Sequence, residues 1–472
     1  MEEEAMKNDE NLEIYMEKSA KNDDKKRKFW IFRISKHKIM GCGSSSAAEV
    51  APAEIIEPSP PSDDVPSDPK IPTSYRPSII SLQIPNEFGD DVSSDALSER
   101  SDGQEENVEY LYATDVTLQW LLERIADKFK KEIPEDPQWI IERLNRPSWD
   151  LDYATSSVVR VTFGWDDDDL PRSVVLKTPV AKDQRDDEEG KYHYIMFKRE
   201  CNVYEWTQKF PKLVAPNIIH IKKHSKEGSG VVVMEDVSEK GQEQDPVKGL
   251  TLEVVRDLLK QIAYLHSVSL KHTSWSTLVA DLPPSYYAHT IGNFDETMTF
   301  FERQDVDHSR FVHIGKYFSD EYLHSTATET TELLEIPKVL VHGEPYASNV
   351  FTKMEGKEQR ILSLIDWTEG HSGCFAEDVA KIICWNLNAK ERVDNTSSLL
   401  EGYHFHLARY YDGDCPFTVD IIQRCYELFV PFAMVSLCGK VMSVKNKTEK
   451  EPLIERAKSL IQQVYAMERL NE

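Results

Sequence analysis

The sequence predicts an α+β fold of two lobes, a small lobe built on a β-sheet and a larger, mostly helical lobe, behind a charged N-terminal tail. Three observations lead to this prediction. Strand-like segments gather between residues 156 and 235, helical periodicity dominates after residue 251, and residues 46–108 lack the apolar content of a folded domain. Strands that come first and helices that come later are typical of segregated α+β architectures.

We therefore divide the chain of 472 residues into a tail (1–108), a sheet lobe (109–238) and a helical lobe (239–472). The length suits a bilobal domain with a tail, and 40% apolar residues are ample for a core. The net charge of −26, from 56 basic and 82 acidic residues, argues against a general nucleic-acid partner.

The tail is predicted to be disordered. Its residues 46–108 are rich in Pro, Ser, Asp and Glu, and residues 41–110 hold 15 acidic and 3 basic side chains. Such a composition buries too little apolar surface to offset the entropy of the chain.

A basic and aromatic segment precedes this acidic part. Residues 25–38 contain seven Lys or Arg, no acid, and the rings of Phe29, Trp30 and Phe32. This pattern suits peripheral contact with an anionic membrane through residues 25–45. A solvated basic tail or a targeting signal explains it equally well.

The run Met40-Gly41-Cys42 begins an N-myristoylation pattern, and Cys42 is placed for palmitoylation. The pattern acts only if translation starts at Met40, which exposes Gly41. The seven cysteines show no CxxC or other metal-ligand spacing, so we expect reduced thiols and a cytoplasmic location, with peripheral membrane attachment in the acylated case.

The elements of the sheet lobe follow in chain order. A helix is expected at 115–131, with Thr114 or Asp115 as its cap. After it we expect a hairpin of strands at 156–164 and 172–178, a helix at about 192–209, and strands at about 217–223 and 229–235.

A linker near 236–249 leads into the helical lobe. Helical spacing is found at 251–270, 294–304, 376–388, 396–411, 418–443 and 451–470, and short strands are expected at 339–341 and 361–366. The apolar run from Leu428 to Gly439 is too short to span a membrane and contains Pro431.

The stretch from Val341 to Trp367 carries the most chemistry. Glu344 stands five residues before Asn349, and Asp366 ends an apolar run 17 residues after Asn349. This spacing matches a phosphotransferase loop, in which a carboxylate orients the attacking hydroxyl and an amide and an aspartate hold Mg²⁺. His342 is expected to brace the loop.

Lys177 and Glu200 are candidates for the phosphate site. Lys177 ends the strand run V-V-L-K, and a buried lysine there needs an anionic partner such as ATP phosphates. Glu200 lies on the next helix, where it could pair with Lys177. The alternatives are a lysine that reaches solvent at a strand end, surface acids, and Glu205 in place of Glu200.

Two further pairs of acids have a simple and a functional interpretation. Glu235 and Asp236 end a strand before the linker, which is either an ordinary strand end or a hinge whose backbone binds adenine. Glu377 and Asp378 begin a helix, which favours a capping role. Asp378 could in addition brace the catalytic loop.

At these residues the chain resembles the CHK kinase-like family, in the superfamily of choline kinases and aminoglycoside phosphotransferases, near the insect ecdysteroid kinases. The resemblance covers about residues 110–470 and rests on V-V-L-K-T-P, F-x-x-E-x-x-x-Y, V-M-E-D, A-Y-L-H, V-H-G-E-P-Y-A-S-N-V, L-I-D-W and A-E-D-V-A. It implies a protein-kinase-like bilobal fold and ATP- and Mg²⁺-dependent phosphorylation of a small-molecule alcohol. By resemblance, Lys177 binds phosphates with Glu200, position 344 is the base, and Asn349 and Asp366 hold Mg²⁺.

Two departures from the family pattern matter. The motif H-G-D is His342-Gly343-Glu344 here, and Glu is one methylene longer than Asp. The loop expected to cover the nucleotide, residues 153–157, contains no glycine. The alternatives to an active kinase are therefore a pseudokinase that binds nucleotide with weak or no catalysis, and a membrane-tethered adaptor.

A protein Ser/Thr kinase is disfavoured because D-F-G and A-P-E are absent and a helix follows Asp366 within about ten residues. Aromatic residues of the segment 271–338 are candidates for the acceptor pocket, although core packing explains most of them. They are Trp275, Tyr286, Tyr287, Phe294, Phe300 and Phe301.

Overall fold

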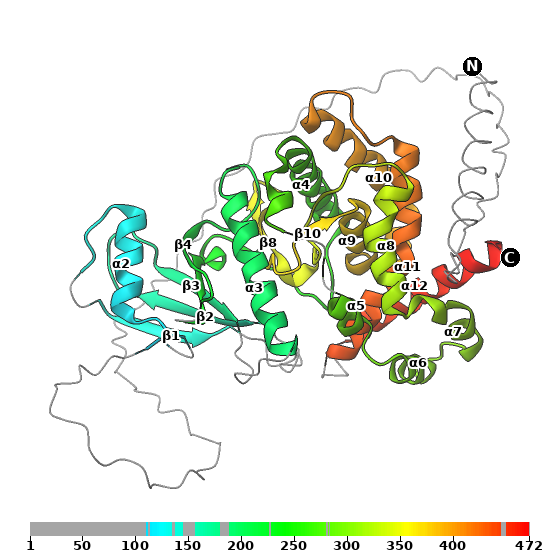
Figure 1. The fold of residues 1–472 in the computed structure, drawn as a ribbon, viewed down its shortest axis with the longest axis horizontal. Coiled ribbons are helices and arrows are strands. Elements are labelled where there is room, and N and C mark those ends of the chain that lie inside the picture. The colour runs from blue at the N-terminus through cyan, green and yellow to red at the C-terminus, as the bar shows by residue number, and fades with distance from the viewer. Residues whose placement is uncertain are drawn as a thin grey trace, which may run out of the picture. The chain divides into compact units, whose positions relative to one another are not determined.

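The computed structural model describes residues 110–471 apart from 112–113, 135–136, 145–155, 180–187, 226–227, 280–281, 283 and 445–449 (Figure 1). All described residues belong to one unit of the chain. The predictions for the tail, for residues 25–45, for the Met40-Gly41-Cys42 motif and for residues 153–155 lie outside the described residues.

Within the described residues, five strands form an antiparallel sheet in the order β1-β2-β3-β5-β4. The strands are β1 (Trp139–Arg143), β2 (Ser156–Phe163), β3 (Ser173–Pro179), β4 (Ile218–Lys222) and β5 (Val231–Glu235). The predicted hairpin and the two later strands are confirmed. Strand β1 was not predicted, because this short edge strand has no buried residue and therefore no clear alternation.

Alternation along β5 separates the two faces of the sheet. Val231 and Val233 belong to a small core with α2 (Leu118–Phe129), whereas Val232 and Met234 belong to the main core with α3 (Glu188–Thr207). Because successive side chains of a strand point to opposite faces, one strand serves both cores. The sheet lobe is thus a sheet with a helix on each face.

The start of α2 differs from the prediction. Thr117 is the N-cap, and its side chain accepts a hydrogen bond from the Trp120 amide. Thr114 instead donates to the Leu111 carbonyl at 2.6 Å, and Asp115 pairs with Lys222 at 3.0 Å. The predicted caps Thr114 and Asp115 were therefore wrong, because Thr114 stabilises a local turn with Leu111 and Asp115 forms a tertiary ion pair with Lys222 before the helix begins.

The linker runs directly from the sheet to the helical lobe. It contains the 3₁₀ turn η2 (Val237–Glu239) and β6 (Gln242–Glu243), and β6 pairs with β8 (Val350–Glu355). β8 in turn forms a hairpin with β9 (Glu358–Leu364). A second small pair joins β7 (Val339–Val341) to β10 (His371–Gly373).

Helices make up most of the rest of the described chain (Figure 1). They are α4 (Leu252–Lys271), α5 (Pro284–Ile291), α6 (Phe294–Glu302), α7 (His308–Ile314), α8 (Asp320–Leu333), α9 (Ala376–Asn386), α10 (Ala389–Tyr411), α11 (Val419–Ser443) and α12 (Glu451–Asn471). The predicted helices are confirmed. The prediction missed α5 and α7, which are short, and α8, whose many Thr and Glu residues blur its apolar face.

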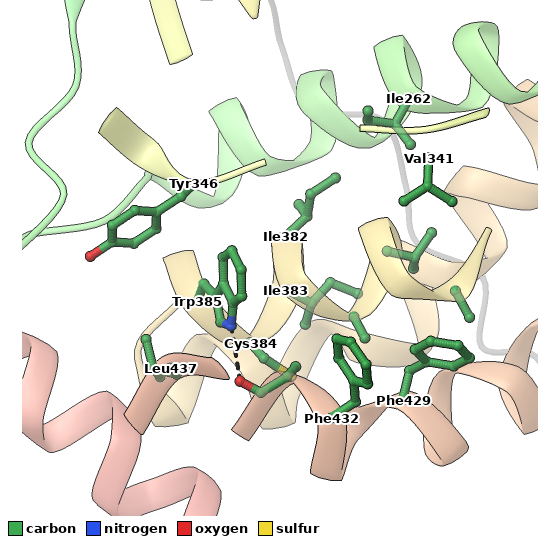
Figure 2. Close-up of a cluster of buried hydrophobic side chains, with 14 of the residues drawn as sticks. Ile262, Val341, Tyr346, Ile382, Ile383, Cys384, Trp385, Phe429, Phe432 and Leu437 are labelled. Atoms are coloured by element: carbon green, nitrogen blue, oxygen red, sulfur yellow. Dashed lines mark hydrogen bonds between the residues drawn. The ribbon is translucent and has the colours of Figure 1, made fainter. Parts of the chain in front are cut away.

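Helix α11 is the one helix among the described residues that is long and apolar enough to cross a membrane by length and composition. Of its most apolar window, 72% is buried inside the protein. Figure 2 shows how Phe429, Phe432 and Leu437 of α11 lie against side chains of α9 such as Trp385. We therefore describe α11 as a core helix.

The same core supports the segment that carries the Glu344 motif. Val341 and Tyr346, which flank Glu344, are fully buried above α9, and the Trp385 indole donates to the Ala433 carbonyl at 2.9 Å (Figure 2). The loop is thus fixed on a rigid base. The predicted α+β fold, with a small sheet lobe and a larger helical lobe, is confirmed for the described residues.

Candidate functional site

Lys177 of β3 is the centre of a buried polar cluster. It is 6% exposed, and its ammonium donates to Glu200 Oε1 at 2.8 Å, Asp366 Oδ1 at 2.6 Å and Thr368 Oγ1 at 2.9 Å. An ammonium has three N–H groups, so all of them are used. The alternative of a lysine that reaches solvent does not hold in this structure.

Glu200 of α3, and not Glu205, is the acid that meets Lys177. Glu200 is fully buried, whereas Glu205 is exposed and pairs with Lys223 at 2.9 Å. The helix turns by about 100° per residue, so these two positions lie on different faces. The sequence analysis preferred Glu200 because of its apolar neighbours on the helix.

Thr368 completes this cluster and was not predicted. Its hydroxyl oxygen lies 2.6 Å from Asp366 Oδ1 and 3.1 Å from Glu200 Oε2. Only its place two residues after Asp366 could have pointed to it. Since its side chain contacts the cation and both carboxylates, it fixes their relative positions.

The charged groups of this cluster shift one another's pKa values. Burial disfavours a charged lysine, but the carboxylates of Asp366 and Glu200 outweigh it and raise the pKa of Lys177. Burial also disfavours the Asp366 carboxylate, yet the Lys177 ammonium holds its pKa well below the usual range. Burial raises the pKa of Glu200 despite Lys177. Asp366 is therefore the more firmly ionised of the two acids.

Asn349 lies beside Asp366 at the end of the β8–β9 hairpin. The Ile365 amide donates to the Asn349 carbonyl at 2.9 Å, and Val350 pairs with Leu364. The Asn349 side-chain amide donates to the Glu344 carbonyl at 2.9 Å. Its oxygen Oδ1, which the Ser348 hydroxyl approaches at 3.5 Å, is then the atom with lone pairs to offer.

These two oxygen donors fit Mg²⁺, which usually takes one or two protein ligands and completes its shell with water and phosphates. Asp366 is 42% exposed, and its backbone φ of +61° turns it out of the strand. Among the described residues, no group of three or more His, Cys, Asp or Glu could hold a metal ion. This donor set does not fit zinc, which prefers four N or S ligands.

Asp378 braces the loop before Glu344. Its two oxygens accept hydrogen bonds from the backbone amides of His342 at 2.8 Å and Gly343 at 2.9 Å, and His266 lies 3.3 Å from it. The N-cap of α9 is Phe375, so Asp378 does not cap its helix. Burial opposes its charge, but the hydrogen bond from His266 and the histidine neighbours lower its pKa.

His342 links the loop to Asp366. Its Nδ1 accepts from the Glu344 amide at 3.2 Å, and its Nε2 donates to the Ile365 carbonyl at 3.1 Å. Burial lowers the pKa of His342, which keeps the neutral form that this pattern needs. The imidazole ring packs edge-on against the Trp367 ring, with 4.5 Å between the ring centroids.

Gly343 allows two segments of the site to touch. Its φ is +88°, and a Cβ atom there would lie 2.7 Å from the Glu369 carbonyl oxygen. The Lys381 ammonium donates to the Gly343 carbonyl at 2.6 Å. A residue with a side chain would push Glu369 away from the loop.

Glu344 itself is held by a lysine that was not predicted. Its Oε1 accepts from the ammonium of Lys440 on α11 at 2.6 Å, and the two side chains are 23% and 15% exposed. Lys440 also lies over the rings of Tyr346 and Trp385, at 5.1 and 4.9 Å from their centroids. No spacing rule links a loop to a helix 96 residues downstream, so the sequence offered no signal.

A second acid, Glu369, lies close to Glu344. The Tyr286 hydroxyl donates to Glu369 Oε2 at 2.5 Å. Burial, together with the charge of Glu344, raises the pKa of Glu369 well above its usual range. Of the aromatic residues considered for the acceptor pocket, Tyr286 thus reaches the site. It is buried in the same main core as Trp275, Tyr287 and Phe301, and Phe294 and Phe300 pack against that core.

Glu235 and Asp236 use their side chains within the protein. Asp236 accepts from Ser173 at 2.7 Å and from Arg160 at 2.5 Å, and Glu235 accepts from the Asn217 amide at 2.9 Å. In the main chain, the Glu235 amide donates to the Asn217 carbonyl at 2.9 Å and the Asp236 carbonyl accepts from the Glu239 amide at 3.2 Å. The hinge interpretation stays a prediction.

The assembled site has a buried cation between two acids, two oxygen donors beside it, and a carboxylate on a braced loop. Such a site can bind phosphate groups and a divalent cation, and can accept a proton from a hydroxyl.

Comparison with known proteins finds a relative that is described as kinase-like. The "Uncharacterized kinase-like protein D1044.1" of Caenorhabditis elegans is 25% identical over 201 residues, which cover 42% of this chain and 52% of that protein. The chain thus matches about half the length of this curated relative.

Solved structures with a similar fold include two phosphotransferases. Choline kinase from Cryptosporidium parvum Iowa II is 13% identical, with 70% of this chain and 89% of that chain covered and a TM-score of 0.44. Aminoglycoside 2'-phosphotransferase-IIIa in its GDP complex is 14% identical, with 73% and 97% covered and a TM-score of 0.40.

The family model DUF1679, described as "Uncharacterized oxidoreductase dhs-27", matches residues 181–470, which is more than half of the chain. The chain therefore belongs to the DUF1679 family, and its similarity to a kinase-like protein of Caenorhabditis elegans agrees with the predicted resemblance.

Proposed function

We propose that this protein is a phosphotransferase that moves the terminal phosphoryl group of ATP to a hydroxyl group of a small molecule, with Mg²⁺. The observation that carries the proposal is the arrangement of Lys177 between Glu200 and Asp366, next to Asn349. A buried lysine whose three donors are all held by polar side chains is costly to retain for stability alone, and phosphate binding gives a reason for it.

Each residue of the site has a role in this proposal. Lys177, oriented by Glu200, binds phosphate oxygens of ATP. Asp366 and Asn349 would hold Mg²⁺, which neutralises charge on the phosphates when it is bound. Lys177 then donates to a phosphate oxygen in place of Asp366.

Glu344 orients the acceptor. Its carboxylate accepts the proton of the hydroxyl while the hydroxyl oxygen forms a bond to the terminal phosphorus and the bond to the ADP oxygen breaks. Asp378 and His342 keep the Glu344 backbone in place. The side-chain amide of Asn349, a proposed metal ligand, also donates to the Glu344 carbonyl. Catalysis then depends on positioning more than on covalent chemistry.

The test is a screen of the purified full chain with ATP and Mg²⁺ against a library of alcohols, with phosphorylated products detected by mass spectrometry. We expect a product that disappears with EDTA and falls at least about a hundredfold in Glu344→Ala. Absence of any product, or a product that Glu344→Ala leaves unchanged, overturns the proposal.

A pseudokinase is the second candidate, and two observations favour it. Glu344 replaces the usual aspartate, and Lys440 already occupies one of its oxygens. Such a protein would bind nucleotide without turnover. A large gain in turnover on Glu344→Asp indicates a weakened enzyme or pseudokinase, whereas a loss indicates a pocket built around glutamate.

The third hypothesis, a membrane-tethered adaptor, depends on residues 25–45 and on Gly41 and Cys42. We propose cytoplasmic location with peripheral membrane contact through this segment. Pelleting of the full chain with anionic liposomes, compared with a chain from Met40 with and without acylation, tests it. Equal absence of binding removes the hypothesis.

The description of the family names an oxidoreductase, but we do not propose this activity. Dinucleotide sites of the common type lie at the carboxyl ends of parallel strands beside a glycine-rich turn. Strand neighbours in the described sheets are antiparallel. The site around Lys177 offers phosphate and metal ligands instead.

A further inference from the structure

We propose that Lys440 is a positioning residue for Glu344, and that their ion pair adapts a glutamate to the place of the usual aspartate. The inference rests on the proposed phosphotransferase function and deepens it. It gives a residue of α11, a helix without a recognisable motif, a role in positioning Glu344.

The pair has the properties of a fixed contact. Lys440 Nζ lies 2.6 Å from Glu344 Oε1, and the side chains are 15% and 23% exposed. A charge-assisted bond of this length, largely removed from water, is stronger and more directional than a surface ion pair. Lys440 occupies Oε1 of Glu344, and no side chain among the described residues is bonded to Oε2, which remains for a hydroxyl.

Two aromatic rings hold Lys440 in turn. The ammonium lies 5.1 Å from the Tyr346 ring centroid and 4.9 Å from that of Trp385. The rings are themselves anchored, since the Tyr346 hydroxyl donates to the Pro246 carbonyl at 2.6 Å and Trp385 donates to Ala433 (Figure 2). The lysine is therefore placed by the core and has little freedom to follow Glu344.

The backbone of α11 is set just as tightly beside Lys440. A Cβ atom at Gly439 would lie 2.5 Å from the Thr290 carbonyl oxygen, so α11 and the end of α5 are in close contact. The backbone position of Lys440 is thus fixed by this contact.

A fixed partner matters because glutamate has one more rotatable bond than aspartate. An unpaired Glu344 would sample several rotamers, and a misplacement of about an ångström costs roughly a hundredfold in rate. The bond to Lys440 selects one position of the carboxylate. In this proposal the bond to Lys440 compensates for the longer side chain at the position of the base.

The experiment measures phosphate release from ATP with Mg²⁺, which needs no knowledge of the acceptor, together with the Kd of ATP from calorimetry. The variants are Lys440→Met, Lys440→Arg and, as a control, Lys390→Met, which removes an 85% exposed lysine of α10. We expect kcat of Lys440→Met to fall about tenfold to a hundredfold with KM and Kd for ATP within about twofold. Lys440→Arg is expected to recover part of kcat, and the control to match the unaltered protein.

A merely structural lysine would move stability, KM and kcat together, so thermal unfolding is recorded for each variant. Glu344→Asp is combined with Lys440→Met, because a shorter side chain cannot keep the bond. We expect the second substitution to add little to the first.

Additive effects, or an unchanged kcat in Lys440→Met, overturn the inference while the proposed function stands. No phosphate release from the unaltered protein, and no transfer to any alcohol, overturns both.

Discussion

Lys177 and Asp366 are 189 residues apart in the sequence, yet the ammonium of one donates to the carboxylate of the other at 2.6 Å. The first residue belongs to the sheet lobe, and the second follows β9 by two residues in the helical lobe. This bond therefore joins the two lobes at the candidate site. It also places a positive charge where phosphates and Mg²⁺ are proposed to bind.

Removal of the Lys177 ammonium is expected to weaken both nucleotide binding and the fold. In Lys177→Met, the fully buried Glu200 loses its cation, so we expect a loss of about 1–3 kcal/mol in the free energy of unfolding. The Kd of ATP should rise at least about tenfold. Urea unfolding and calorimetry measure these changes. Lys223→Met, which breaks an exposed pair with Glu205, should change neither quantity.

Thr368 provides a gentler change in the same cluster. Thr368→Val keeps the shape but leaves Lys177 with one partner fewer, since their distance is 2.9 Å. We expect a loss of about 1–2 kcal/mol in the free energy of unfolding and weaker Mg²⁺-dependent binding of ATP. Thr368→Ser, which retains the hydroxyl, serves as the control. Equal stability of the Val and Ser variants would argue against a role for this hydroxyl.

Gly343 tests the close approach of the loop to Glu369. Gly343→Ala introduces strain at a φ of +88° and a contact of 2.7 Å with the Glu369 carbonyl oxygen. Gly356→Ala is a matched control, because its φ is +66° and nothing lies within 4 Å of the added atom. The control should cost about 1 kcal/mol from backbone strain alone, and Gly343→Ala clearly more. Chemical denaturation of both variants gives the difference, and equal losses would contradict the predicted clash.

Glu369 gives the site a pH dependence with a definite sign. Its pKa is raised from the ordinary value of 4.5, because of burial and the charge of Glu344. The folded chain therefore binds this proton more tightly than the unfolded chain. The contribution to stability is complete below pH 4.5 and is lost as the pH rises through the folded pKa.

Glu369→Gln removes the titration and retains an acceptor for Tyr286. We expect the Tm of this variant minus the Tm of the unaltered protein to increase as the pH rises from about 5 to about 8. Glu401→Gln, at an exposed position of α10, is the control. A difference in Tm that shrinks with rising pH would contradict this account.

The sequence was sufficient for those parts of the site that follow chain order. Lys177 lies within β3 and Glu200 within α3, while Asn349 directly precedes β8 and Asp366 follows β9 by two residues. Strand and helix patterns therefore indicated where these four residues stand. The proposed reaction class was predicted from the spacing of Glu344, Asn349 and Asp366.

Contacts between distant segments could not be predicted in the same way. Lys440 meets Glu344 because α11 packs beneath the loop, and Thr368 contacts Lys177 because the two lobes close on Asp366. The predicted cap of α2 was wrong for a related reason, since Asp115 forms an ion pair with Lys222 of β4. Local propensity does not contain such tertiary partners.

The most direct test of the central proposal is a calorimetric titration of ATP with and without Mg²⁺, on the unaltered protein and on Asp366→Asn. We predict that Mg²⁺ tightens ATP binding to the unaltered protein at least about tenfold, and that Asp366→Asn abolishes this gain. Equal affinity with and without Mg²⁺, or the same gain in Asp366→Asn, would contradict a metal-dependent nucleotide site at Lys177 and Asp366.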